Sequence, residues 1–412
     1  MPVNPAYNEA SYVQILNQAP MPPLSSLFLG LVLAAATAAV SSLARWSRRD
    51  ELVVGLVLTL LLCLNFVPRV QQISPELLQH LDSEPAAGTY IFDGVQLLKA
   101  YHLFRGGMSY YEAHRDAIRG DARKLNPRAS SLRFPALFYA WSFLPAPHWI
   151  AYLAWALVLI AMLSSYLSCA SRGSPAAAVV APVLLGAWFL YASSNWWMIF
   201  ADYWAGLLVL FFLCSWRANY RGLSLILLFS AAMVREFAAL FLLAGASTFL
   251  MRPSQRRLGM LWIGTLVLVV VLYLLHGIGV KYTLGETVVG TFTLRLGSPS
   301  AQLATGLTFG SPVVVARDFV MPVVLLLAFS SWHLRRDSAS LLLVAGLVLN
   351  LVLMAFMIGE STPYYGFNLI PSAILGSAWS LAAVLSEGDA PVLHSAPLET
   401  VPSAAGQTRQ FC

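Results

Sequence analysis

Apolar runs of about 20 residues recur along the whole chain, each bounded by a short charged or Pro/Gly-rich segment. A helix rises about 1.5 Å per residue, so a run of this length matches the roughly 30 Å hydrocarbon core of a bilayer. In lipid every backbone N–H and C=O must be hydrogen-bonded within the protein, which favours helices. The pattern predicts an all-α integral membrane protein, a polytopic helical bundle of about 10–12 transmembrane segments.

The clearest candidate spans lie at 24–43, 51–68, 148–169, 176–194, 197–216, 258–275, 313–333, 339–358 and 365–386. Composition agrees, because 58% of the residues are hydrophobic and 11% charged, against about 25% charged residues in a soluble domain. Residues 1–23 lack the basic region of a cleaved signal peptide, so the first run is expected to remain as a helix. The Ser/Pro/Ala/Gly-rich tail at 387–412 is expected to be disordered and cytoplasmic.

Arginines gather in the short loops between apolar runs. They are Arg45, Arg48, Arg49, Arg172, Arg217, Arg221, Arg252, Arg256, Arg257, Arg335 and Arg336. Cytoplasmic loops carry an excess of Lys and Arg, so these loops are predicted to be cytoplasmic. The stretch 69–147, the loop 276–312 and the turn 359–363 then lie at the outer face of what we expect to be a bacterial inner membrane. The net charge of +6 is explained by topology and does not imply a nucleic-acid partner.

Two segments do not fit a simple span. Residues 222–251 place Arg235 and Glu236 in the middle of apolar sequence, and one straight helix there would be about 45 Å long. Both ends of this segment are basic, so we expect two short helices that meet at Arg235–Glu236. Residues 134–146 are apolar but contain two prolines, which favours a re-entrant or interfacial hairpin over a full crossing.

The outer stretch 69–147 is far longer than a connection requires, and loops of that length are commonly functional. Within it, the sequence predicts a helix that begins at Asp93 and stops at Gly106-Gly107. Gln96 stands at the capping-box position relative to Asp93. The residues alone therefore leave Asp93 open between a helix N-cap and a catalytic carboxylate.

This string, an acidic residue followed by a helix, Ala100, Arg105-Gly106-Gly107 and Tyr110, resembles the first outer loop of the GT-C superfamily of membrane glycosyltransferases. It is most similar to the polyprenyl-phosphate-dependent hexosyltransferases grouped with bacterial mannosyl- and arabinofuranosyltransferases.

Two further segments carry the resemblance. Arg133-Phe134-Pro135-Ala136-Leu137-Phe138 resembles that family's Tyr/Phe-Pro-Pro-Leu stretch, with Ala136 in place of the second proline. Met233-Val234-Arg235-Glu236-Phe237 resembles its Leu-Thr-Arg-Glu segment.

The resemblance implies inverting transfer of a hexose or pentose from a polyprenyl-phosphate donor to a glycan, lipid or protein acceptor at the outer face. Asp93 maps to the carboxylate that activates the acceptor hydroxyl, and Arg235 is expected to bind the donor phosphate. Lys281 of the loop 276–312 is a further candidate for the donor phosphate, with solvated surface as the alternative. No cofactor is implied, and the residues leave a divalent metal open without supplying Cys or His at metal-ligand spacing.

Four more residues are candidates for substrate binding or support: Glu236, Asp202, Tyr110 and Tyr364. An ionisable group inside a membrane segment is a functional hypothesis by default, although for Asp202 a structural pairing with a neighbouring helix is an equal alternative. Arg235 and Glu236 have a similar alternative, an internal ion pair that only stabilises the hairpin. For Tyr364 the first interpretation is the aromatic belt at the membrane surface.

Two other functions stay open at this point. An O-antigen-type polymerase or ligase is also many-spanning, but that family carries its largest outer loops later in the chain. A transporter or lipid flippase would be favoured by inverted repeats or by matched broken helices in two halves, and the sequence has neither.

Overall fold

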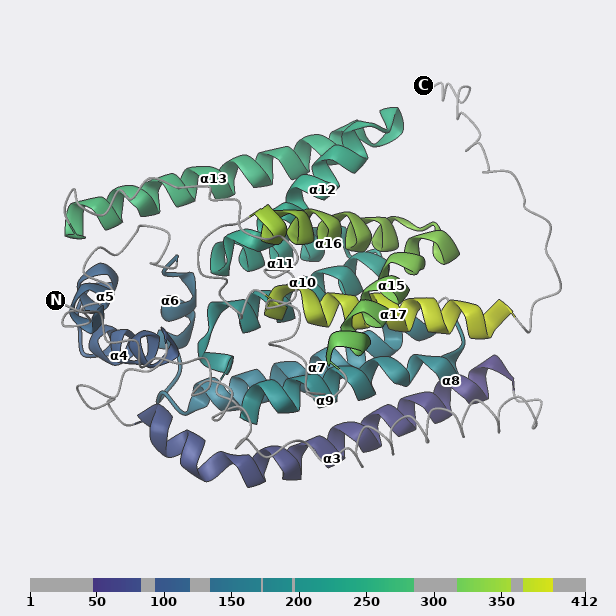
Figure 1. Ribbon diagram of the computed structural model, residues 1–412, viewed down its shortest axis with the longest axis horizontal. Coiled ribbons are helices and arrows are strands. Elements are labelled where there is room, and N and C mark those ends of the chain that lie inside the picture. Colours follow the sequence, from purple (N-terminus) through teal and green to yellow (C-terminus); the bar gives the residue numbers. More distant parts are fainter. Residues whose placement is uncertain are drawn as a thin grey trace, which may run out of the picture.

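The computed structural model of the protein describes residues 47–82, 93–118, 134–171, 173–194, 197–284, 317–356 and 366–387. Within these ranges every regular element is a helix, so the prediction of an all-α protein is confirmed for the part of the chain described. The long helices lie along a common direction, with α3 (Arg48–Asp82) along one side and α13 (Arg256–Leu284) along the other (Figure 1).

Among the described residues, four stretches are long and apolar enough to cross a membrane: Arg48–Val67, Trp149–Ala170, Pro253–Thr283 and Leu369–Ser386. They belong to α3, α7 (Trp149–Ala170), α13 and α17 (Gly366–Glu387). Shorter apolar stretches are Val180–Ser193, Arg221–Val234, Glu236–Leu250 and Ser338–Met354. The expected spans at 51–68, 148–169, 258–275 and 365–386 therefore correspond to observed apolar helices. The run at 24–43 lies outside the described residues.

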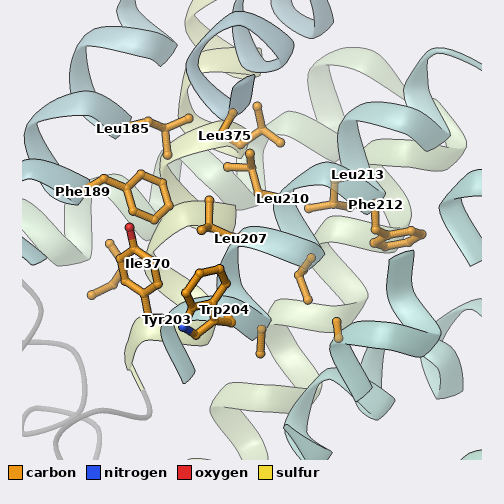
Figure 2. Packing of buried hydrophobic residues seen from close by; sticks show 14 of the residues in the cluster. Leu185, Phe189, Tyr203, Trp204, Leu207, Leu210, Phe212, Leu213, Ile370 and Leu375 are labelled. Atoms are coloured by element: carbon orange, nitrogen blue, oxygen red, sulfur yellow. The ribbon is translucent and has the colours of Figure 1, made fainter. Parts of the chain in front are cut away.

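The core of the bundle is built around α10 (Ala201–Arg217), which is buried on nearly all sides. In Figure 2 its Tyr203, Trp204 and Leu207 lie among side chains of α9 (Val180–Ser194) and α17. The ring centroids of Tyr203 and Phe189 of α9 are 5.4 Å apart, in an edge-on contact. A helix that is apolar on every face belongs at the centre of a bundle, and this one begins and ends with its charged residues, Asp202 and Arg217.

The expected break at Arg235–Glu236 is confirmed. α11 (Arg221–Val234) ends where Arg235 adopts an extended conformation, with φ −150° and ψ 121°, and α12 (Ala239–Leu250) follows one short 3₁₀ turn later. The end of α12 returns to the starting end of α11, because Phe249 packs 5.4 Å from Trp216, beside the turn that precedes Arg221. The two helices thus form a hairpin with Arg235 and Glu236 at its turn.

One end of the bundle collects the basic connections, and we call it the arginine end. Arg48 donates to the Ser171 carbonyl at 3.3 Å, Arg335 donates to the Trp379 carbonyl at 2.7 Å, and the Arg221 guanidinium lies 3.9 Å over the Trp216 ring. Arg217 also lies here, paired with Asp337 of the turn between α15 (Arg317–Arg335) and α16 (Ser338–Phe356) at 3.1 Å. The basic loops predicted to share one side of a membrane therefore share one end of the protein, as far as the structure describes them.

The opposite end carries three short helices, α4 (Asp93–Arg105), α5 (Tyr110–Ile118) and α6 (Ala136–Ser142), which we call the cap (Figure 1). The predicted glycine stop of α4 is confirmed. Gly107 has a φ of 102°, and Met108 N–H donates back to the Leu103 carbonyl at 3.2 Å. With 7 residues, α6 is too short to cross a bilayer, which agrees with the hairpin expected at 134–146.

Cysteine labelling tests which end faces out. Tyr282, at the cap end of α13, and Met251, after α12 at the arginine end, are exposed to nearly the same extent, 87% and 84%. In a variant whose own cysteines are replaced by alanine, a membrane-impermeant maleimide is expected to label Tyr282→Cys in intact spheroplasts and to leave Met251→Cys unlabelled until lysis. The reverse pattern would place the cap in the cytoplasm and contradict the positive-inside assignment.

Candidate functional site

Three of the residues singled out in the sequence meet at the turn of the α11–α12 hairpin, and we call this group the tip. Arg235 Nε donates to Asp202 Oδ1 at 2.7 Å, and Arg235 Nη1 donates to Glu236 Oε1 at 3.2 Å. The side chains of Arg235 and Asp202 are 0% and 2% exposed, whereas that of Glu236 is 43% exposed. Asp202 and Arg217 are 15 residues apart on α10, so the tip lies about 22 Å from the arginine end.

Burial makes this pairing obligatory for Arg235. An isolated charge in a low-dielectric interior costs several kcal/mol, and a hydrogen-bonded opposite charge offsets much of that cost. The Phe237 ring, 4.8 Å from the guanidinium carbon, adds a cation–π contact. Asp202 also lies in the first turn of α10, where the helix dipole stabilises a carboxylate. The structural alternatives considered for Asp202 and for Arg235–Glu236, an interhelical pair and an internal pair, are both present in the structure.

The charges of the tip bear directly on phosphate binding. Two carboxylates surround one guanidinium, so an incoming phosphate meets a group that is not net positive. Exchange of one of these carboxylates would open Arg235 to a phosphate. Glu236 is the exchangeable one, because it is partly exposed whereas Asp202 is held inside the bundle.

The cap is tied to the tip through aromatic contacts. Tyr101 of α4 donates to the Trp141 carbonyl of α6 at 2.8 Å, and the Trp141 ring lies 5.9 Å from Trp204, two residues after Asp202. Helix α6 also contacts α11, and α4 contacts the 3₁₀ turn Trp197–Ile199 that precedes α10. The helix that begins at Asp93 is therefore packed on the end of the bundle that holds the tip.

Tyr110, expected to support the substrate, is an internal residue of the cap. It is 2% exposed, and its ring lies 4.6 Å from His114 and 5.2 Å from Phe138. Its packing joins α5 to α6, which suits a role in holding the cap together.

Lys281 lies near the end of α13, beyond the level of the tip. The Tyr273 hydroxyl of α13 donates to the Ala232 carbonyl, one turn before Arg235 in α11, at 2.9 Å. Lys281 is eight residues further along α13, about 12 Å away along the axis, and is exposed. The structure thus joins Asp202, Arg235 and Glu236 and sets Lys281 beside the cap instead.

Helix α13 reaches the cap through a close contact with α5. The Tyr111 hydroxyl and His276 Nδ1 are 3.1 Å apart, with their rings stacked. A Cβ built on Gly279 would lie 2.7 Å from the Tyr111 ring, so the absence of a side chain there leaves room for the tyrosine.

Sequence reasoning missed several polar contacts. Asp82, at the end of α3, accepts hydrogen bonds from the His148 backbone N–H at 3.0 Å and pairs with its Nδ1 at 2.8 Å. No local pattern marks this pair, since 66 residues separate its members. The Ser109-x-x-Glu112 capping box of α5 was readable from spacing: the Ser109 hydroxyl and N–H donate to the Glu112 carboxylate and hold its pKa below the usual value.

Other expectations fall outside the described residues, among them Tyr364, residues 285–312 and the tail at 388–412. Within the described ranges no group of three His, Cys, Asp or Glu side chains is placed to hold a metal ion.

Comparisons with known proteins add no relative: no family matches the chain, and neither a curated protein nor a solved structure does. The fold defines a class only, a helical protein that has, in the part of the chain described, four helices long and apolar enough to cross a membrane. A finer assignment depends on the short motifs and on where the fold brings them.

Proposed function

We propose that the protein is an integral membrane glycosyltransferase that uses a polyprenyl-phosphate sugar and works at its cap end. The observation that carries the proposal is the convergence of three motifs that are far apart in the sequence. The motif of α4 and α5, the Phe134–Phe138 stretch and the Arg235–Glu236 turn all lie at one end of the bundle. The arginine end, predicted to face the cytoplasm, is the opposite one.

The location suits a lipid-linked donor. A polyprenyl-phosphate sugar cannot leave the bilayer, so its anomeric carbon stays at the membrane surface, where outer helices and the ends of spans meet. In the proposed reaction an acceptor hydroxyl attacks that carbon and passes its proton to Asp93. The bond between the anomeric carbon and the phosphate oxygen breaks with inversion, and polyprenyl phosphate leaves.

The other candidates take roles around this reaction. Arg235 stabilises the leaving phosphate, which takes the place of Glu236 on the guanidinium. Asp202 holds Arg235 in position from inside the bundle. Lys281 meets the donor from the end of α13. Tyr110 supports the cap from inside, and Tyr364 is assigned to the outer turn. The acceptor is a glycan, lipid or protein, and the membrane is proposed to be a bacterial inner membrane, crossed by about 10–12 segments with the cap on the outside.

The test is transfer by purified protein in lipid nanodiscs supplied with polyprenyl-phosphate mannose, arabinose or glucose and with cell-envelope glycan as acceptor. Radiolabel is expected to move to the acceptor from at least one of these donors, and not from a nucleotide sugar. Transfer only from a diphosphate-linked oligosaccharide would favour a polymerase or ligase. Movement of the intact donor between leaflets of liposomes without transfer would favour a flippase.

Glu236→Gln tests how Arg235 meets the phosphate. If the phosphate takes the place of Glu236 on the guanidinium, removing the competing negative charge should lower the KM for the donor about tenfold, which corresponds to about 1.4 kcal/mol. Glu112→Gln in α5 is the matched control, because that carboxylate is exposed and engaged by Ser109, and it should leave the KM unchanged. A higher KM in Glu236→Gln would show that Glu236 itself binds substrate.

A further inference from the structure

Residues 139–152 run from the end of α6 through the connection 143–148 into the first turn of α7 and expose large apolar side chains, and we call this segment the elbow. Phe143 is 88% exposed, Tyr139 53%, Trp149 44% and Tyr152 42%. Solvent-exposed apolar residues of this size are common singly, but four on the two sides of one short connection form a surface that needs a partner.

Several backbone polar groups of the elbow are hydrogen-bonded within the protein. Pro145 and Pro147 carry no N–H, and the carbonyls of Leu144 and Pro145 accept hydrogen bonds from Arg105 Nη1 at 3.1 Å and Nη2 at 2.8 Å. The N–H of His148 is held by Asp82 of α3 at 3.0 Å. A backbone polar group left unpaired in lipid costs several kcal/mol, so these contacts from α3 and α4 make the elbow tolerant of lipid.

The exposed residues of the elbow continue into α7. Trp149, Tyr152, Ile160 and Leu167 are all exposed and lie on one face of the helix, because their spacings are close to whole turns. The stripe is aromatic at the elbow and aliphatic further along, toward Ser171 at the arginine end. Tyrosine and tryptophan favour the boundary between headgroups and acyl chains, whereas Ile and Leu favour the hydrocarbon.

We infer that the elbow is a bilayer-binding surface. Phe143 and Tyr139 insert at the boundary between headgroups and acyl chains of the leaflet at the cap end, with Trp149 and Tyr152 at the same depth. The occupant is phospholipid and not a protein partner, because the patch is continuous with the exposed stripe of α7, a helix of membrane-spanning length. The elbow thereby holds the cap against the bilayer. This inference rests on the bundle crossing a bilayer and is independent of sugar transfer.

Quenching by lipids that carry nitroxides at known depths tests the inference. Single cysteines at Phe143, Tyr139, Ile160 and Arg115, in the variant whose own cysteines are replaced, are labelled with a bimane fluorophore and reconstituted in phosphatidylcholine vesicles. The labels at Phe143→Cys and Tyr139→Cys should be quenched most by nitroxides close to the headgroup. The label at Ile160→Cys should be quenched most by nitroxides deep in the acyl chain. Arg115 is on α5, and its side chain is 45% exposed. A label at Arg115→Cys should be quenched by neither kind of nitroxide.

Two results would overturn the inference. In the first, the label at Ile160→Cys is quenched by lipid, but the labels at Phe143→Cys and Tyr139→Cys are quenched no more than the label at Arg115→Cys. This result would show that the elbow lies in water. In the second, the label at Ile160→Cys is not quenched by lipid. This result would contradict the membrane-spanning bundle on which the inference depends. Two elbow positions are used so that a label that disturbs one of them does not decide the result.

Discussion

Replacing Asp93 with asparagine is expected to lower the rate of sugar transfer about 100- to 10,000-fold while the protein stays folded. Asparagine caps a helix about as well as aspartate, so α4 should still begin at this position. It cannot accept the proton of the acceptor hydroxyl at neutral pH. The measurement is transfer from the polyprenyl-phosphate sugar by purified Asp93→Asn protein whose thermal stability is recorded in the same preparation.

Asp93→Ala is the companion variant, because it loses both the predicted cap and the carboxylate. It should be as inactive as Asp93→Asn and less stable by about 0.5–2 kcal/mol. An asparagine variant that transfers sugar at nearly the normal rate would make Asp93 a cap only. The base would then be sought at the tip, where Glu236 is the better candidate because Asp202 is buried against Arg235.

Breaking the buried pair at the tip is expected to have the largest effect on stability. Asp202→Ala leaves the Arg235 guanidinium buried without its closest carboxylate, and loss of one partner of such a pair costs about 3–5 kcal/mol. Asp116→Ala removes the carboxylate of the exposed Arg115 pair and should cost about 0–1 kcal/mol, which makes it the control. Unfolding in detergent, followed by circular dichroism, measures both.

A double variant separates stability from function at the same site. Replacement of a whole buried pair by apolar residues of similar size is often neutral, so Asp202→Leu with Arg235→Met should recover most of the stability lost in Asp202→Ala. If Arg235 binds the donor phosphate, the double variant should remain inactive. A stable double variant with normal transfer would show that the pair is only structural.

Arg235→Lys tests the phosphate contact alone. This variant should fold and lose most activity, because lysine cannot bind a phosphate in the bidentate geometry of arginine.

The elements that the sequence predicted well depend on local properties. The long apolar helices follow from run length, the end of α4 from a glycine pair, and the hairpin from two charged residues in apolar sequence with basic ends. Each signal lies within a few turns of the chain. Helix α3 was less predictable, since it continues past the expected span end at 68 to Asp82, through sequence that is no longer uniformly apolar.

The contacts that build the site depend on tertiary packing and could not be predicted in the same way. The Asp202–Arg235 pair joins residues 33 positions apart, and the sequence offered Asp202 no particular partner. Tyr110 was a candidate for substrate binding or support, but its place in the packing of the cap depends on Phe138, which reaches it only after α5 and α6 pack together. The distance of Lys281 from the tip could not be predicted either, because it follows from the continuous length of α13.

The buried pair at the tip also constrains the biogenesis of a membrane-spanning chain. Helix α10 leaves the ribosome first and carries Asp202 without its guanidinium, which arrives 33 residues later at the turn of the next hairpin. A lone carboxylate near a span is unfavourable in hydrocarbon, and so is a lone arginine at the turn of two short helices. In the membrane protein proposed above, the low-energy route would be for α10, α11 and α12 to enter lipid together with the Asp202–Arg235 pair already formed, which would couple synthesis of this region to its folding.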